Sequence, residues 1–320
     1  MQEHDAEPGY DIIGDVHGYA DRLEALLHQL GYRVTNGVYR HPTRTAVFVG
    51  DLIDRHPADQ VRTVRIVRAM VDAGSAQIVL GNHEFNAVAF ATERPDGGHW
   101  RQHTEQNRRQ HGAFLDTVGF GSSLHRELID WFMTIPLWLD LGDVRIVHAC
   151  WNAADLDHLA PLVGPGDTLT PELIADGSTP EHQSYIAVER ILKGPEIHMD
   201  GYSYLDKGGH QRFLARACWW NPEARTLRDA AVIPSGSELV DPDGAPADAL
   251  PDRPLDDGSV PVYHDPVPVV VGHYWREFPL GLEAPHVACV DYSAGKGGPL
   301  VAYQWHHGDE RLADDRFVWA

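Results

Sequence analysis

The sequence is poor in cysteine, in basic residues and in long apolar runs. Its three cysteines, Cys150, Cys218 and Cys289, lie far apart and form no CxxC pair. This pattern supports neither a disulfide framework nor a cysteine-type zinc site. No apolar run approaches the roughly 18 residues of a membrane-spanning helix, and the acidic start lacks a signal-peptide region. We therefore expect a cytoplasmic protein with reduced thiols and no membrane partner.

Basic residues are also scarce relative to acidic ones. The 320 residues include 26 Lys and Arg against 47 Asp and Glu, which gives a formal net charge of −21 at pH 7. Such a surface repels polyanions, so we expect no long nucleic acid as a partner. A small phosphorylated ligand stays compatible with this charge, because a bound metal ion reverses the local field.

The first half of the chain alternates short apolar strands with amphipathic helices. Residues 10–14, 45–50 and 76–80 indicate strands, whereas residues 19–30 and 57–73 carry apolar side chains at helical spacing. This alternation predicts a layered α/β core with helices outside.

The second half is less regular. Apolar strands are expected at 144–147, 267–271, 287–291 and 299–305. Between residues 152 and 262, Pro, Gly and Asp are frequent and periodicity is weak. We expect this segment to be an irregular cap or substrate-binding insertion within one domain of residues 1–320.

Polar signatures follow several of these strands at the point where each strand ends. They are Gly14-Asp15-Val16-His17-Gly18, Gly50-Asp51-Leu52-Ile53-Asp54-Arg55, Gly81-Asn82-His83-Glu84 and Gly272-His273-Tyr274-Trp275. The strand at 144–147 is likewise followed by His148. Because ligands collect at the carboxyl ends of strands in α/β sheets, we expect these side chains to converge.

The converging groups are carboxylates, an amide oxygen and imidazoles, without a thiolate. Oxygen ligands combined with imidazole suit manganese, iron or zinc. Two ions roughly 3.5–4 Å apart need a bridging carboxylate, and Asp51 lies centrally among the motifs. Each motif alone has an ordinary explanation, such as a helix N-cap at Asn82. Their joint occurrence at strand ends favours a metal centre.

These motifs resemble those of the calcineurin-like metallophosphoesterases, in the forms of the phosphoprotein-phosphatase branch. That branch includes bacterial diadenosine tetraphosphatases and phage protein phosphatases. The resemblance covers residues 10 to about 150 and about 265 to 305, and no motif of 152–262 matches. It implies a four-layer α/β/β/α sandwich of two mixed sheets flanked by helices.

The resemblance also implies a role for each motif residue. It assigns the first metal to Asp15, His17 and Asp51, and the second to Asp51, Asn82, His148 and His273. His83 then stays off the metals and protonates the leaving group. Asp54 orients that imidazole, and Arg55 binds the phosphate oxygens.

The chain departs from the branch after Arg55, where His56 and Pro57 replace the usual glycine. A residue before proline prefers extended geometry, which leaves the direction of Arg55 open. We expect His56 to face solvent, with a substrate contact as the alternative.

Several residues outside the motifs remain open. The branch has a second phosphate-binding arginine between the two late histidines, where this chain offers Arg190, Arg212 and Arg216. Lys296, in a glycine-rich turn, is a candidate for binding phosphate or a base. The alternative is that it is an exposed lysine of the turn without such a role. Trp219 and Trp220 are expected to pack in the core, with stacking on a nucleobase as the alternative. The histidines without a patterned context are expected to be structural or exposed: His103, His111, His125 and His182.

The sequence thus predicts a two-metal phosphoesterase acting on a phosphoprotein or a small phosphomonoester, with a metal-bridging hydroxide as nucleophile. The expected cofactors are two divalent transition-metal ions, manganese before iron or zinc. The expected partner is a small phosphorylated substrate or phosphopeptide, and nothing indicates the oligomeric state. Two alternatives stay open: a dinucleoside polyphosphate hydrolase, and a non-catalytic metal-dependent scaffold.

Overall fold

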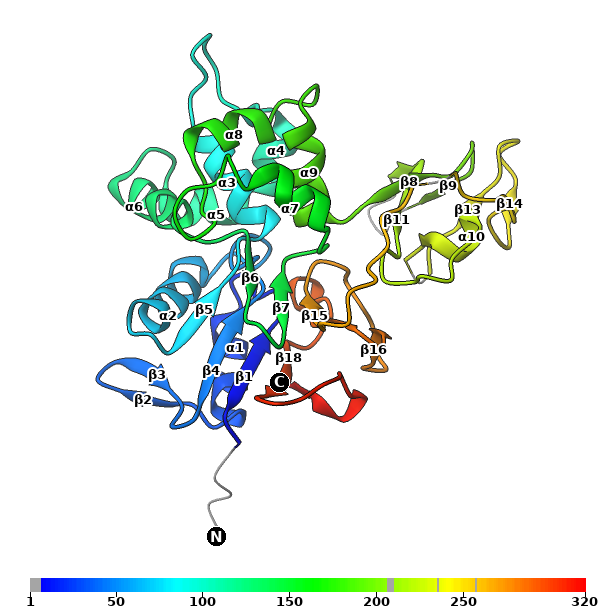
Figure 1. Cartoon of the computed structure of the whole chain (residues 1–320). Helices are drawn as coiled ribbons and strands as arrows, with labels where there is room; N and C mark the ends of the chain where they lie inside the picture. The colour runs from blue at the N-terminus through cyan, green and yellow to red at the C-terminus, as the bar shows by residue number, and fades with distance from the viewer. Residues whose placement is uncertain (1–6, 206–209, 235, 257) are drawn as a thin grey trace.

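Two five-stranded sheets form the centre of the molecule (Figure 1). The computed structural model describes residues 7–205, 210–234, 236–256 and 258–320. The first sheet has the order β19-β18-β1-β4-β5 and the second the order β16-β17-β15-β7-β6. Each sheet contains both parallel and antiparallel pairs, so both are mixed, as predicted.

In the first sheet, β1, β4 and β5 run parallel, and β18 and β19 complete the sheet in antiparallel pairs. Its strands are β1 (Gly9–Ile13), β4 (Arg44–Phe48), β5 (Ala76–Ile78), β18 (Val301–His306) and β19 (Phe317–Trp319). Two helices connect the parallel strands, α1 (Ala20–Gln29) and α2 (Gln60–Asp72). The turn Asn36-Gly37 joins the hairpin of β2 (Arg33–Thr35) and β3 (Val38–Arg40).

In the second sheet, β15 pairs in parallel with both β7 and β17, and β6 and β16 are the antiparallel edges. Its strands are β6 (Trp138–Asp140), β7 (Arg145–Val147), β15 (Val269–Val271), β16 (Leu282–Ala284) and β17 (Val287–Cys289).

The two sheets pack face to face. Ile12 and Val47 of the first sheet share a buried cluster with Ile146 and Val270 of the second. Neighbouring Phe48, by contrast, belongs to the cluster that contains the helices. Because side chains alternate across a strand, each sheet buries one face against the other sheet and the other against helices. This arrangement confirms the predicted α/β/β/α sandwich.

A buried ion pair fixes the strand that leads into the site. The Arg44 Nε atom of β4 donates to the Asp11 carboxylate of β1 at 2.9 Å, and both side chains are buried. Tyr32 donates to the same carboxylate at 3.0 Å, and Gln304 of β18 does so at 3.1 Å. Three neighbouring strands are therefore connected through one side chain.

The segment 152–262 is more ordered than the sequence pattern indicated. Its first part forms three helices, α7 (Ala153–Leu159), α8 (Pro171–Gly177) and α9 (Gln183–Lys193). The expectation of an irregular segment was wrong here, because helices of 7 to 11 residues give a weak periodic signal. They lie beside helices from the first half (Figure 1), namely α3 (Asn82–Ala91), α4 (Glu105–Gln110), α5 (Gly112–Val118) and α6 (Ser123–Phe132).

The remainder of this segment forms two small sheets that project to one side (Figure 1). One contains β8 (Glu196–His198), β11 (Leu214–Ala217) and β12 (Ala231–Val232). The other contains β9 (Ser203–Leu205), β10 (Gln211–Arg212), β13 (Leu239–Val240) and β14 (Pro246–Ala247), and the short α10 (Leu227–Ala230) lies close by. Trp219 and Trp220 are buried, as expected. Whether the segment acts as a cap stays a prediction.

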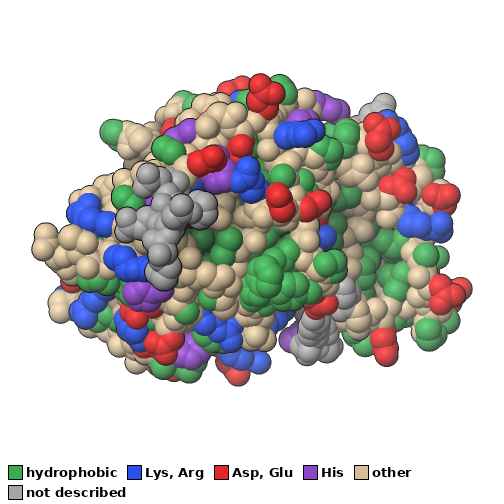
Figure 2. Space-filling model, turned by 90° about the horizontal axis from the view of Figure 1, so that it is seen from below, with side chains coloured by type: hydrophobic (Ala, Val, Ile, Leu, Met, Phe, Trp, Pro, Cys, Tyr) green, Lys and Arg blue, Asp and Glu red, His purple; other side chains and the backbone are tan. Residues whose placement is uncertain are grey.

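Charged side chains of both signs are interspersed over the face shown in Figure 2. The acidic excess is therefore not gathered into one patch on that face. Among the described residues, no helix combines the length and the apolar character needed to cross a membrane.

Candidate metal centre

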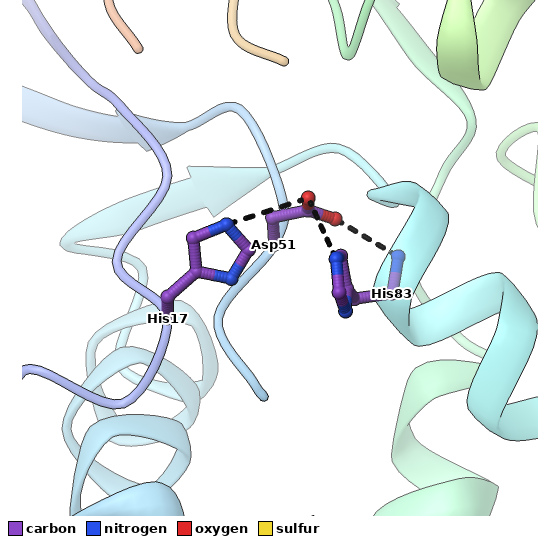
Figure 3. A group of neighbouring side chains, drawn as sticks. All are labelled: His17, Asp51 and His83. Atoms are coloured by element: carbon purple, nitrogen blue, oxygen red, sulfur yellow. Dashed lines mark hydrogen bonds and ion pairs between the residues drawn. The ribbon is translucent and has the colours of Figure 1, made fainter. Parts of the chain in front are cut away.

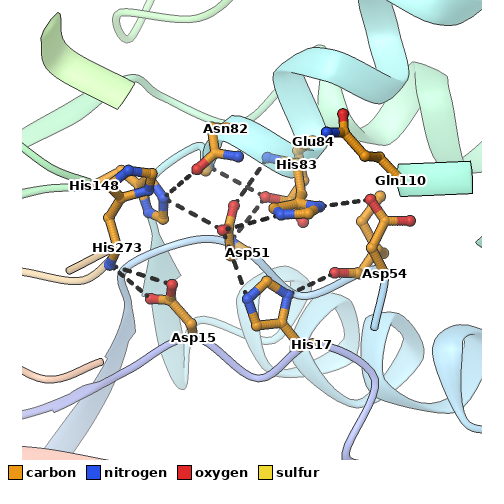
Figure 4. Close-up of polar contacts among 12 residues, drawn as sticks. Asp15, His17, Asp51, Asp54, Asn82, His83, Glu84, Gln110, His148 and His273 are labelled. Atoms are coloured by element: carbon orange, nitrogen blue, oxygen red, sulfur yellow. Dashed lines mark hydrogen bonds and ion pairs between the residues drawn. The ribbon is translucent and has the colours of Figure 1, made fainter. Parts of the chain in front are cut away.

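The candidate ligands come from turns that directly follow parallel strands. Asp15 and His17 follow β1, Asp51 follows β4, and His148 and His273 follow β7 and β15. Asn82 begins α3, after β5. Because parallel strands end at the same edge of a sheet, the structure brings all six side chains together (Figure 4).

Several site residues have left-handed backbone conformations. The φ angles are 49° for His17, 50° for Asp51, 67° for Asp54, 69° for Arg55 and 70° for His273. Each costs an ordinary residue roughly 1 kcal/mol or more. Arg55 therefore makes a sharp turn although no glycine follows it.

Asp51 is the central side chain. Its Oδ2 atom lies 3.8 Å from Nε2 of His17, 3.8 Å from Nε2 of His83 and 3.5 Å from Nε2 of His148. Its Oδ1 atom accepts the His83 backbone N–H at 2.9 Å (Figure 3). Burial acts to raise the pKa of Asp51, but the three imidazoles, His148 foremost, lower that pKa well below its usual value.

The potential ligand atoms form two groups that share Asp51. One group is His17, Asp51 and His83, and the other is Asp51, His148 and His273. Within each group the ligand atoms lie within 4.8 Å of one another. A carboxylate common to two groups is the arrangement that a pair of ions requires.

Hydrogen bonds on the far side of the imidazoles fix which nitrogen faces the centre. Nδ1 of His17 donates to the Ile53 carbonyl at 2.9 Å, and Nδ1 of His148 donates to the Val49 carbonyl at 2.6 Å. Since a carbonyl only accepts, Nδ1 carries the proton in the neutral form of each ring, and that form presents an Nε2 lone pair to a metal. Nε2 of His273 is buried without a hydrogen-bond partner among the described residues. These donors therefore fit divalent ions.

Asp15 and Asn82 lie beside the same histidines. The Asp15 carboxylate accepts the His273 backbone N–H at 3.2 Å, and the Asn82 Oδ1 atom lies 3.1 Å from Nε2 of His148. Burial, and then the charges of Asp291 and Asp51, raise the pKa of Asp15 well above its usual value. A nearby cation would offset both the cost of burying the Asp15 carboxylate and the repulsion from Asp291 and Asp51.

Glu84, which sequence reasoning treated only as part of a motif, holds two of the turns together. Its buried carboxylate accepts the N–H groups of Asp51 and Leu52, each at 2.8 Å, and that of Gly81 at 3.2 Å. A Cβ atom at Gly81 would lie 2.2 Å from the Asp51 nitrogen, so only glycine allows this approach. Burial, and then the charge of Asp51, raise the pKa of Glu84 to about 7.

His83 and Asp54 form a close pair. Nδ1 of His83 lies 2.5 Å from Asp54 Oδ2, so Nε2 points toward Asp51 (Figure 4). Burial acts to lower the pKa of His83, but the charges of Asp51 and Asp54 raise that pKa overall. The geometry thus groups His83 with one set of potential ligands and also with an orienting carboxylate.

Two histidines make contacts that the sequence pattern did not indicate. His111, expected to be structural or exposed, is buried with Nδ1 3.0 Å from Asp54 Oδ1. No local pattern signals this contact, because 57 residues separate the two. His56, expected to face solvent, is half-buried with its ring centroid 4.3 Å from that of Tyr19, because its turn folds back against the start of α1.

A cavity of about 320 Å³ opens beside the candidate ligands. Its lining includes five basic side chains, Arg55, Arg101, Lys193, Arg212 and Arg216. Sequence reasoning missed Arg101, which donates to Asn86 at 2.9 Å and to Gln110 at 2.7 Å.

The remaining basic candidates differ in position. Arg190 does not line the cavity, because it pairs with Asp155 at 2.9 Å between α9 and α7. Lys296 Nζ lies 3.4 Å from the ring centroid of Trp275. Trp275 lines the cavity and is 41% exposed.

The family follows from comparison with known proteins. The sequence model described as calcineurin-like phosphoesterase matches residues 10–176, more than half of the chain. The chain belongs to the calcineurin-like phosphoesterase family. This assignment confirms the family resemblance and the fold class predicted from the sequence.

Curated relatives match about half of the chain. It is 30% identical over 175 residues to bis(5'-nucleosyl)-tetraphosphatase PrpE of Oceanobacillus iheyensis, covering 52% of this chain and 63% of that protein. It is 45% identical over 150 residues to the protein of the same name from Bacillus velezensis, a match that covers 46% of this chain and 58% of that protein. The chain thus spans less than two thirds of the length of these relatives.

A solved structure shares the fold. A protein serine/threonine phosphatase from Saccharomyces cerevisiae, described as similar to human phosphatase PP5, has a TM-score of 0.51 and 14% identity. The match covers 98% of this chain and 79% of that one.

The role of Glu84 leads to a prediction. In Glu84→Gln, one acceptor oxygen is replaced by an amide that faces backbone N–H groups, and unpaired buried groups cost about 1–3 kcal/mol. We expect chemical denaturation to show a lower free energy of unfolding by that amount, together with weaker manganese binding. The exposed Glu223→Gln variant is the control and should match wild type. Unchanged unfolding and metal binding in Glu84→Gln would contradict the role.

Proposed function

We propose that this protein hydrolyses phosphate esters or anhydrides with two divalent metal ions. The observation that carries the proposal is the Asp51 carboxylate shared by two groups of potential ligands. Asp15, His17 and Asp51 would hold one ion, and Asp51, Asn82, His148 and His273 the other. Manganese suits this set of oxygen and imidazole ligands. When bound, the two ions activate water and neutralise charge on the phosphoryl oxygens.

In this mechanism, His83 donates a proton to the leaving oxygen. Asp54 accepts the Nδ1–H group of His83, so the imidazole is held in one orientation with Nε2 toward the centre. The carboxylate also stabilises the protonated ring, as expected of a general acid that starts each cycle charged. Arg55, exposed at the cavity, offers a planar pair of donors to the phosphoryl oxygens.

The five basic side chains favour a substrate with several phosphate groups. A phosphomonoester carries at most about two negative charges at neutral pH, whereas a chain of phosphates can contact several guanidinium groups. The curated relatives named bis(5'-nucleosyl)-tetraphosphatase support the same class. A dinucleoside polyphosphate is therefore the substrate that we propose, ahead of a phosphopeptide or small phosphomonoester.

Lys296 and Trp275 provide the second part of this proposal. Their contact places a cation and an exposed indole at one side of the cavity. A nucleobase can stack on an exposed aromatic ring, and the lysine can meet a neighbouring phosphate.

The role of His83 predicts a dependence on the leaving group. In His83→Asn, turnover of an alkyl phosphate should fall by roughly 10²- to 10⁴-fold, because its alkoxide needs a proton to leave. Turnover of p-nitrophenyl phosphate should fall less, since p-nitrophenolate is a good leaving group. Steady-state kinetics on both substrates, with metal content measured in parallel, test this. Equal losses on both substrates together with lost metal would overturn the acid role.

The basic lining predicts that Arg212 contributes to recognition of the phosphate chain. In Arg212→Gln, the KM for diadenosine tetraphosphate should rise about tenfold, because a charge-assisted hydrogen bond contributes about 1.5–3 kcal/mol. Arg190→Gln is the matched control, because Arg190 pairs with Asp155 and does not line the cavity. Its KM should stay near wild type. A rise in Arg190→Gln alone would contradict the assignment.

A further inference from the structure

The carboxylate of Asp54 faces two imidazoles. Its Oδ2 atom lies 2.5 Å from Nδ1 of His83, and its Oδ1 atom lies 3.0 Å from Nδ1 of His111. All three side chains are buried. The roles that the resemblance implies include the first of these contacts and not the second.

His111 is built into the fold at the junction of two helices. It ends α4 and precedes α5, and its backbone N–H bonds to the Asn107 carbonyl at 3.1 Å. Its ring centroid lies 5.0 Å from that of Phe114 and 5.6 Å from that of Phe90. The ring therefore has little freedom to move away from Asp54.

The protonation of His111 follows from its neighbours. Nδ1 faces a carboxylate, which accepts hydrogen bonds, so this nitrogen is the donor. Nε2 is buried and has no hydrogen-bond partner among the described residues. Among the described residues, Asp54 is thus the one hydrogen-bond partner of the His111 ring. His111 also lines the cavity.

The backbone of Asp54 is fixed separately from its side chain. The residue has a left-handed conformation with φ of 67°, and its N–H donates to Gln60 Oε1 at 2.7 Å. The torsion that turns the carboxylate plane is broad and roughly two-fold, so backbone geometry alone does not set it. The hydrogen bond from His111 to Oδ1 holds the carboxylate plane in the orientation in which Oδ2 accepts from His83.

We propose that His111 is a positioning residue that holds the Asp54 carboxylate in the plane required to orient His83. This inference rests on the proposed function, since it adds one residue to the hydrogen-bonded chain that orients the proposed proton donor His83. His111 acts through Asp54 and does not itself deliver the proton.

Two substitutions separate the hydrogen bond from the packing. His111→Phe keeps a ring between Phe90 and Phe114 but removes the donor. His111→Asn loses the ring but has a side-chain amide that can donate to Asp54 from nearly the position of Nδ1. The measured quantity is kcat for an alkyl phosphate divided by kcat for p-nitrophenyl phosphate, with KM, metal content and unfolding recorded for each variant.

The expected result is a change in this ratio that follows the hydrogen bond. In His111→Phe the ratio should fall about tenfold, the lower end of what outer-layer partners contribute, with KM and metal content unchanged. His111→Asn should recover most of the ratio. His125→Phe is the matched control: His125 is a buried histidine with an unpartnered Nε2 near the same Phe114. Its ratio should equal that of wild type.

An unchanged ratio in His111→Phe would overturn the proposal, and so would an equal fall in His111→Phe and His125→Phe. If His111→Asn behaves like His111→Phe, the hydrogen bond is not the cause and the proposal also fails. Failure of the proposed function is distinguishable, because wild type itself would then show no manganese-dependent turnover of diadenosine tetraphosphate or of either monoester.

Discussion

The interaction on which the site depends is the buried Asp51 carboxylate surrounded by imidazoles from both sheets. His17 follows a strand of the first sheet and His148 a strand of the second, and both direct Nε2 toward the same oxygen. A buried carboxylate is costly unless it is paired. The neighbouring imidazoles lower the pKa of Asp51, and bound cations would favour its ionised form further. The sandwich is therefore a means of bringing strand ends from two sheets to one atom.

That convergence requires strain and close backbone contact. Asp51 and His273 adopt left-handed conformations, and Glu84 satisfies the N–H groups that the turns leave unpaired. Strained residues persist only where the surrounding structure fixes them. Here the buried carboxylate of Glu84, the contact at Gly81 and the hydrogen bonds to Val49 and Ile53 provide that support.

The motifs at the strand ends could be predicted because each is local: a strand, a turn and a polar side chain within a few residues. The position of Asp51 at the centre of the ligand groups followed from the same pattern. His111 and Arg101 could not be predicted, because their contacts join distant segments without a recognisable spacing. The exclusion of Arg190, which leaves Arg212 and Arg216 at the cavity, likewise depended on tertiary structure. The three helices between residues 153 and 193 were missed because each is too short for a clear period.

Sharing of Asp51 between two ions is the central claim, and electron paramagnetic resonance tests it most directly. Wild-type protein loaded with two manganese ions per chain should give the exchange-coupled spectrum of a dinuclear centre. In Asp51→Asn, the coupled spectrum should be lost and that of isolated ions should remain, because without the carboxylate common to both ligand groups the variant should no longer hold two ions at once. An uncoupled spectrum in fully loaded wild type, or a coupled spectrum that persists in Asp51→Asn, would contradict the account.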